Sequence, residues 1–259
     1  MTSHGVWLAT AGGGGAAHVI VVHGSLDRSA GLLKLSRRLD DRFLVTRYDR
    51  RGYGRSRPHH GPFTIGAQVD DLVEVIESTT PGTGVPTVVI GHSYGGNVAL
   101  AAADRHPHRI DAVVTYETPL SWLEWWGGTA GGDAVAWRHD PEEAAERFMR
   151  RLIGDERWER LPASSRDARR AEGFAMVDEL TDLRARPPWH ADRIGVPVLC
   201  LYGEHGRPHH QRGALELAAM LPDARLAMVE GAHHFGPNTH PDETAELVAA
   251  HIAHVTTAS

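Results

Sequence analysis

Short runs of apolar, often β-branched residues recur along the chain, separated by segments in which apolar residues follow a helical period. Apolar runs bounded by turn-forming residues are typical of buried strands. They predict strands at 19–22, 43–48, 87–90, 112–116, 196–202 and 226–229, with an edge strand at 6–8. The intervening segments predict helices near 29–39, 66–79, 95–105, 210–220 and 241–254. This alternation favours an α/β fold with a mostly parallel, doubly wound sheet.

One long segment interrupts the alternation. Between about residues 119 and 193 no convincing strand is found, and helical patterns follow one another at 141–153, near Trp158 and at 164–183. A helical block inserted between two strands of a regular α/β unit indicates a cap over the sheet. We therefore expect a core of residues 1–118 and 194–259 and a helical cap of residues 119–193.

Composition narrows the possible partners. The 259 residues are enough for one sizeable core. The net charge of −6 comes from mixed signs without a basic block, which argues against a nucleic-acid partner. The single cysteine, Cys200, lies in an apolar run, so we expect it to be buried and unpaired. No secretory signal pattern and no run of ~20 apolar residues is found. We therefore expect a soluble, cytoplasmic protein without a membrane partner, and its oligomeric state stays open.

The most informative motif joins the apolar run 87–90 to a small-residue helix through Gly91-His92-Ser93-Tyr94-Gly95. A serine between a strand and a helix, with a glycine two residues away on each side, is typical of a nucleophile elbow. The turn is too sharp for side chains at the flanking positions. It lifts the Ser93 hydroxyl above the edge of the sheet and points the main-chain N–H of Tyr94 toward the group that Ser93 attacks.

Tryptophans are concentrated in the predicted cap and at its borders. Trp122, Trp125 and Trp126 follow the strand 112–116 closely. Open α/β sheets bind ligands at the carboxyl ends of their strands, so these three rings are candidates to line an apolar substrate pocket. We expect at least one of them to face the pocket while the others join the cap to the core.

Four motifs resemble those of the α/β-hydrolase-fold superfamily, in its cap-bearing serine esterase branch. They are the oxyanion-loop motif His23-Gly24-Ser25-Leu26, the turn Asp49-Arg50-Arg51-Gly52-Tyr53-Gly54-Arg55-Ser56, the elbow from Gly91 to Gly95, and the late histidine loop Gly231-Ala232-His233-His234-Phe235. The likeness runs from about Val19 to the C-terminal helix. It implies the α/β-hydrolase fold, with the helical cap inserted after the strand 112–116, the sixth in the family's numbering, and it implies no cofactor.

The resemblance also implies catalytic roles. An acyl-transfer serine needs an imidazole to accept its proton, and that imidazole needs a carboxylate to fix its tautomer. The tetrahedral oxyanion needs two hydrogen-bond donors. Ser93 matches the nucleophile, Tyr94 N–H the first donor and Ser25 N–H the second, with Leu26 as a less favoured second donor. His23 is expected to shape this loop, and His23 and Leu26 to border the substrate.

The base has two adjacent candidates, His233 and His234. His234 matches the family's spacing better, because it directly precedes Phe235 and stands seven residues before Pro241, where the last helix is predicted to begin. We therefore assign the base to His234. The histidine pairs 59–60 and 209–210 suggest a metal site, but no third ligand stands at a recognisable spacing from either pair, so no metal is predicted.

The acid departs from the family's usual pattern. The family commonly places an aspartate a few residues after its seventh strand, where this chain has Gly206. Glu204 is one alternative. A second location in the family directly follows the sixth strand, where this chain has Glu117, and this choice keeps the order serine, acid, histidine. We favour Glu117, with Glu204 second and a site without a working acid third.

These features predict a serine hydrolase that cleaves a carboxylic ester or related small acyl compound through an acyl-enzyme, with Ser93, His234 and Glu117 as its triad. A serine at the elbow argues against the branches of the family with an aspartate nucleophile. Acyl transfer to an alcohol, lactone opening or closure, carbon–carbon bond hydrolysis and cofactor-free perhydrolysis use the same triad, and the residues do not separate them. Because residue 206 is not an aspartate, a non-hydrolytic receptor, lyase or cyclase stays open as the alternative.

Overall fold

The computed structural model describes residues 1–258 except 14, 81, 83 and 128. Gly128 of the predicted cap, and Gly14, Pro81, Thr83 and Ser259 of the predicted core, therefore lie outside the described residues.

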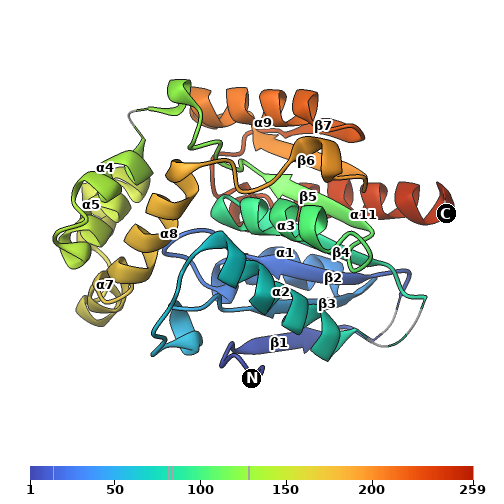
Figure 1. Ribbon diagram of the computed structural model, residues 1–259, viewed down its shortest axis with the longest axis horizontal. Coiled ribbons are helices and arrows are strands. Elements are labelled where there is room, and N and C mark those ends of the chain that lie inside the picture. The colour runs from blue at the N-terminus through green and yellow to red at the C-terminus, as the bar shows by residue number, and fades with distance from the viewer. Residues whose placement is uncertain (14, 81, 83, 128, 259) are drawn as a thin grey trace.

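A seven-stranded sheet forms the centre of the molecule (Figure 1), in the order β1-β3-β2-β4-β5-β6-β7. The strands are β1 (Leu8–Ala11), β2 (His18–Val22), β3 (Leu44–Tyr48), β4 (Thr87–His92), β5 (Ala112–Tyr116), β6 (Val198–Gly203) and β7 (Ala224–Val229). β1 runs antiparallel to β3, and the other neighbours are parallel. The six predicted strands from 19–22 to 226–229 are confirmed as β2 to β7, with ends shifted by at most two residues.

The edge strand lies two residues later than predicted. Its pairing begins at Leu8, opposite Tyr48, whereas Val6 is fully buried but outside the ladder. The apolar character of Val6 therefore reflects packing in the core rather than strand pairing.

Helices cover both faces of the sheet. One face carries α1 (Leu33–Leu39) and α11 (Pro241–Ala258), and the other carries α2 (Ile65–Thr79), α3 (Tyr94–Arg105) and α9 (Pro208–Met220). Successive side chains of a strand point to opposite faces of the sheet. In β2, Val19 and Val21 belong to one apolar cluster, and Ile20 and Val22 belong to the other. This is the predicted doubly wound arrangement. Among the described residues, no helix is long and apolar enough to cross a membrane.

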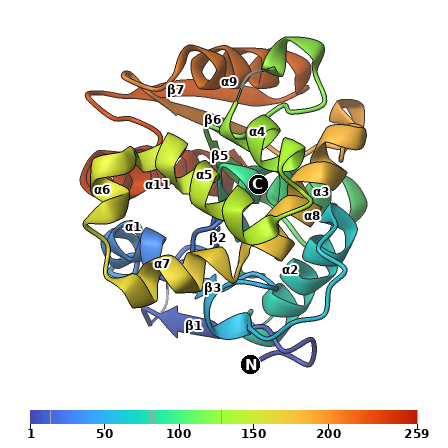
Figure 2. The ribbon, with the colours of Figure 1, turned by 90° about the vertical axis from the view of Figure 1, so that its left-hand side faces the viewer.

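The remaining helices are short or belong to the block between β5 and β6. The short ones are η1 (Ser29–Leu32), η2 (Gly54–Ser56) and α10 (Gly236–Thr239). The block holds η3 (Glu124–Trp126), α4 (Ala130–Ala136), α5 (Pro141–Ile153), α6 (Asp155–Glu159), α7 (Ala163–Arg170), α8 (Gly173–Ala185) and η4 (Ala191–Arg193). Helices α4, α5, α7 and α8 gather beyond one end of the sheet in Figure 1 and face the viewer in Figure 2.

The segment 164–183, predicted as one helix, forms two helices, α7 and α8. The chain bends at Glu172, whose carboxylate is buried, pairs with Arg28 at 2.7 Å and accepts the N–H of Gly54 at 2.9 Å. Gly173 then packs so closely on the carbonyl of Pro141 that a Cβ would overlap it. Contacts with distant parts of the chain therefore interrupt a locally helical pattern.

A buried ion pair joins α8 to the loops at the end of the sheet. Glu179 of α8 and Arg50 are both fully buried, and Arg50 Nη1 donates to Glu179 Oε2 at 2.7 Å. The same carboxylate accepts the hydroxyls of Ser25, at 2.6 Å, and Tyr53, at 2.7 Å. Arg50 also donates to the carbonyls of His23 and Gly24 in the loop after β2. One carboxylate thus fixes α8 against the loops that follow β2 and β3.

Replacing Glu179 by alanine is expected to lower the free energy of unfolding by about 3–5 kcal/mol, because Arg50 is left as an uncompensated buried charge. The exposed pair of Arg212 with Glu216 is the control, and Glu216→Ala should cost less than about 1 kcal/mol. Urea unfolding of both variants measures the difference. A Glu179→Ala variant as stable as the Glu216→Ala variant would contradict this account of how α8 is held against the loops after β2 and β3.

Candidate active site

Ser93 occupies a strained turn between β4 and α3. Its φ of 53° and ψ of −124° lie outside the regions that non-glycine residues ordinarily adopt. The flanking glycines are required by close approach: a Cβ on Gly95 would overlap the carbonyl of Val22, and one on Gly91 would overlap the start of α3. The elbow predicted from the sequence is therefore present in its backbone geometry.

Left-handed backbone angles gather around this turn. The non-glycine residues with positive φ in the described parts of the chain are Leu26, Ser93 and Glu117, with φ of 50°, 53° and 46°. They follow the carboxyl ends of β2, β4 and β5, which are neighbours in the sheet. Each such angle is costly for a residue with a side chain, and strain of this kind concentrates at functional sites.

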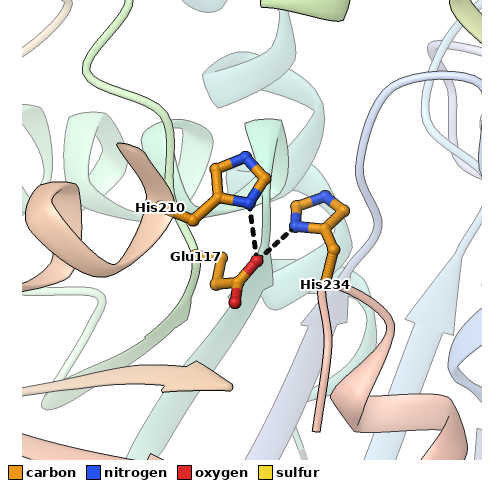
Figure 3. Close-up of side chains that lie close together, drawn as sticks. All are labelled: Glu117, His210 and His234. Carbon is orange, nitrogen blue, oxygen red and sulfur yellow. Dashed lines mark hydrogen bonds and ion pairs between the residues drawn. The ribbon is translucent and has the colours of Figure 1, made fainter. Parts of the chain in front are cut away.

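The structure brings His234 and Glu117 together. His234 Nδ1 lies 2.7 Å from Glu117 Oε2, and the carboxylate is fully buried (Figure 3). Glu117 Oε1 accepts the N–H of Gly203 at 3.1 Å. With the Nδ1 proton donated to Glu117, the Nε2 atom of a neutral His234 is left as a proton acceptor.

The neighbouring histidine, His233, points elsewhere. Its Nδ1 contacts the carbonyl of His205 at 2.7 Å, and its side chain is exposed. Main-chain contacts fix the loop that holds both histidines: Tyr116 donates to the carbonyl of His233, and His92 Nε2 lies 2.8 Å from the carbonyl of His234. The loop geometry thus favours His234 over His233 as the base.

The alternative acid, Glu204, does not reach the histidine. It is exposed, and its Oε2 accepts the N–H of Gly231 at 2.8 Å. Gly206, which stands where the family commonly has an aspartate, faces Glu117 instead: a Cβ built there would overlap Glu117 Oε1. The absence of a side chain at 206 therefore leaves the space that the Glu117 carboxylate occupies.

A second histidine, which the sequence analysis did not assign to this site, shares the same carboxylate. His210 of α9 places Nδ1 at 2.7 Å from Glu117 Oε2, and its ring stacks on His234 with centroids 4.4 Å apart (Figure 3). The sequence shows the histidine pair 209–210, but its carboxylate partner, Glu117, follows β5 and is distant along the chain. Candidate ligand atoms of Glu117, His210 and His234 lie within 4.8 Å of one another, so these three residues could hold a metal ion.

Burial and the contacts among His234, His210 and Glu117 together shift the pKa values of these groups. It lowers the pKa of His234, the nearby His210 lowers it further, and the hydrogen bond to Glu117 acts in the opposite direction. Burial also lowers the pKa of His210. For Glu117, burial raises the pKa, but hydrogen bonds from His210 and His234 outweigh it and hold the pKa far below its usual range. Near neutral pH the site therefore contains an ionised carboxylate beside two neutral imidazoles.

The two predicted oxyanion donors lie beside Ser93. Tyr94 is the first residue of α3, and the Gly24 backbone is so close that a Cβ on it would stand 3.0 Å from Ser93 Cβ. Among the described residues, neither Ser25 N–H nor Tyr94 N–H donates to a main-chain acceptor outside the regular helices and strands. Both amides are candidates for binding a developing oxyanion.

A cavity of about 290 Å³ opens beside these groups. Its lining includes Ser25, Ser93, Tyr94, Trp126, Phe148, Leu180, Arg184, Arg207, His210 and His234. Within the described residues, the Ser93 hydroxyl does not reach hydrogen-bond geometry with His234. In ligand-free enzymes such contacts are often long and tighten when substrate binds.

Four of the five predicted substrate-binding residues do not line this cavity; only Trp126 does. Trp122 packs edge-on against Trp189, and Trp125 lies under the Arg212 guanidinium. His23 is fully buried, with its ring nitrogens at the Gly24 carbonyl and the Arg50 N–H. Leu26 belongs to the apolar core. These four side chains pack against other protein groups and do not face the cavity.

Comparison with known proteins places the chain in a family. The family described as alpha/beta hydrolase fold matches residues 17–166, more than half of the chain, so the protein belongs to it. A 2-(acetamidomethylene)succinate hydrolase of Mesorhizobium japonicum is 25% identical over 90% of this chain and 87% of its own length. A pimeloyl-[acyl-carrier protein] methyl ester esterase of Aromatoleum aromaticum is 30% identical over 76% of this chain and 82% of its own length.

Solved structures agree on the fold. A thermophilic esterase from Thermogutta terrifontis superposes with a TM-score of 0.75 at 22% identity, over 97% of this chain and 94% of that one. The family and the relatives together support a hydrolase of the α/β fold.

Replacing Glu117 by glutamine is expected to lower kcat by ~10³–10⁴-fold with little change in KM, because the carboxylate orients His234 and stabilises its protonated form during the reaction. Glu204→Gln is the matched control and should stay within about tenfold of the unmodified protein. Steady-state kinetics on a chromogenic ester measure both. The reverse pattern would move the acid to the loop after β6.

We expect kcat/KM to fall at acid pH with a midpoint below 6.5, the ordinary pKa of histidine. The reason is that the pKa of His234 is lowered and that a histidine base is active only when neutral. His210→Gln removes a group that lowers this pKa, so the midpoint should move upward. Profiles of kcat/KM from about pH 4 to about pH 9 measure it, with the exposed His254→Gln as control. A downward shift in His210→Gln would refute the coupling.

Proposed function

We propose that the protein is a serine hydrolase that cleaves a carboxylic ester or a related small acyl compound through an acyl-enzyme. The observation that carries this proposal is the 2.7 Å contact between Glu117 and His234 in a site whose cavity also contains Ser93 on its strained elbow. The family and the relatives, which are hydrolases and esterases, support the same class of reaction.

In the proposed reaction, His234 Nε2 accepts the hydroxyl proton as Ser93 Oγ attacks the acyl carbon. The N–H groups of Ser25 and Tyr94 bind the oxyanion, each worth about 3–4 kcal/mol in the transition state. Glu117 stabilises the imidazolium that forms on His234. That imidazolium then protonates the leaving group, and the bond between the acyl carbon and the leaving oxygen breaks to give the acyl-enzyme.

Deacylation reverses the roles. His234 takes a proton from water, the resulting hydroxide attacks the acyl carbon, and the ester bond to Ser93 breaks as His234 returns its proton to Ser93 Oγ. This sequence uses only groups of the chain and water. A metal held by Glu117, His210 and His234 would take up a ring nitrogen of His234, the proposed base, and would separate it from Glu117. The proposed mechanism therefore requires this cluster to be free of metal.

The cavity supports a small substrate, because about 290 Å³ lies near the lower end of the range for ligand sites. Trp126, Phe148 and Leu180 give it an apolar wall. The cytoplasmic location and the division into core and cap remain part of this proposal.

Replacing Ser93 by alanine is expected to abolish ester hydrolysis and labelling by a fluorophosphonate probe, since removal of a triad serine typically costs ~10⁶-fold. A panel of chromogenic esters of increasing acyl length measures the first effect, and probe fluorescence on the denatured protein measures the second. Ser121→Ala, another serine that lines the cavity, is the control.

Residual hydrolysis in Ser93→Ala within about tenfold of the unmodified protein would show that the elbow is not the reactive site. Absence of both hydrolysis and labelling in the unmodified protein would instead favour the non-hydrolytic receptor, lyase or cyclase.

A further inference from the structure

Arg184 brings a positive charge into the cavity from the capping helices. It lies near the end of α8, is half-buried, and lines the cavity that contains Ser93 and His234. Its Nη2 donates to the hydroxyl of Thr129 at 2.9 Å. A Cβ built on Gly131 or on Gly132 would stand 3.3 Å from Nη2. The guanidinium therefore rests on small residues and one hydroxyl.

No carboxylate among the described residues is paired with Arg184. The acidic groups nearest to it along α4 and α8 have other partners: Asp133 pairs with Arg151, Glu179 with Arg50, and Asp182 accepts the N–H of Ile65 at 2.8 Å. Burial lowers the pKa of Arg184, and no acidic neighbour acts against this shift. A partly desolvated cation without a counter-charge is unfavourable unless a ligand supplies that charge.

The charge of the cavity is one-sided. Its lining holds two guanidinium groups, of Arg184 and of the exposed Arg207, and no Asp or Glu among the described residues. The chain as a whole has a net charge of −6. A cavity lined by one sign of charge attracts ligands of the opposite sign. Leu180 and Phe148 form an apolar wall of the same cavity. The cavity therefore fits a ligand that combines an anionic group with a short apolar segment.

We propose that Arg184 binds a free carboxylate of the substrate, so that the enzyme acts on small acyl compounds that carry a second, ionised carboxyl group. This inference rests on the proposed function, because it places the scissile carbonyl at Ser93 and the carboxylate at Arg184 within one cavity. A guanidinium binds a carboxylate through paired, charge-assisted hydrogen bonds. A neutral ester of the same length leaves the guanidinium unpaired and is the poorer substrate.

Two esters of equal acyl length test the proposal: 4-nitrophenyl hydrogen adipate, which carries a carboxylate, and neutral 4-nitrophenyl hexanoate. Arg184→Gln is expected to lower kcat/KM for the adipate ester by about 10–100-fold, mainly through KM, and to leave the hexanoate ester within about threefold. Arg184→Lys should fall between, because a lysine keeps the charge but not the paired geometry. Arg186→Gln, an exposed arginine outside this cavity, is the control and should change neither ester.

A binding measurement separates this inference from the proposed function. Calorimetry of free adipate is carried out on the catalytically silent Ser93→Ala variant, with and without Arg184→Gln, after circular dichroism has verified that both are folded. The affinity for adipate should fall at least tenfold when Arg184 is replaced.

Equal losses on both esters, or unchanged adipate affinity in the double variant, would overturn the role of Arg184 while leaving the serine mechanism intact. If the unmodified protein cleaves neither ester and is not labelled by the fluorophosphonate probe, the proposed function fails, and the calorimetric comparison still decides whether Arg184 binds a carboxylate.

Discussion

The geometry of the site depends on the interactions of the buried Glu117 carboxylate. This carboxylate accepts the Gly203 N–H on one oxygen and the Nδ1 proton of His234 on the other, which His210 Nδ1 also approaches to 2.7 Å. A buried anion is tolerated only when it is hydrogen-bonded in this way. Glu117 follows β5, Gly203 ends β6 and His234 follows β7, so one side chain ties together three neighbouring strand ends. The left-handed φ of Glu117 and the missing side chain at Gly206 are the local conditions that allow it.

A second buried carboxylate, Glu179, has the corresponding role on the other side of the nucleophile. Through Arg50 it reaches the carbonyls of the loop after β2, and it holds the Ser25 hydroxyl directly. Glu117 therefore positions the proposed base, and Glu179 positions the loop that carries a proposed oxyanion donor. Because Glu179 belongs to α8, this helix and Ser25, a proposed oxyanion donor, share one hydrogen-bond network. A movement of α8 would therefore change the position of Ser25.

The parts of the structure that the sequence predicted well are those determined locally. Strand 112–116 was predicted with its observed ends, because it is buried on both faces and reads as one apolar run. The elbow at Ser93 was predictable because its residues are adjacent along the chain, and Gly91 is required by close approach to Gly95 and Gly96 within the turn itself. The edge strand was predicted two residues too early, because Val6 packs in the apolar core but does not pair with β3.

The parts that could not be predicted depend on contacts between distant residues. The break between α7 and α8 follows from the pairing of Glu172 with Arg28. The place of His210 in the site follows from its approach to Glu117, which no spacing along the chain indicates. The positions of Trp122 and Trp125 are set by Trp189 and Arg212, so adjacency to a strand end did not decide which ring faces the cavity.

The central claim is that Glu117 fixes the tautomer of His234 so that its Nε2 atom can accept a proton from Ser93. Nitrogen NMR of the ¹⁵N-histidine-labelled protein near neutral pH tests it most directly, with His234 assigned through a His234→Gln variant. We predict a neutral ring with the proton on Nδ1 and a free lone pair on Nε2, and loss of that signature in Glu117→Gln. A His234 ring that carries its proton on Nε2, or one unaffected by Glu117→Gln, would contradict the account.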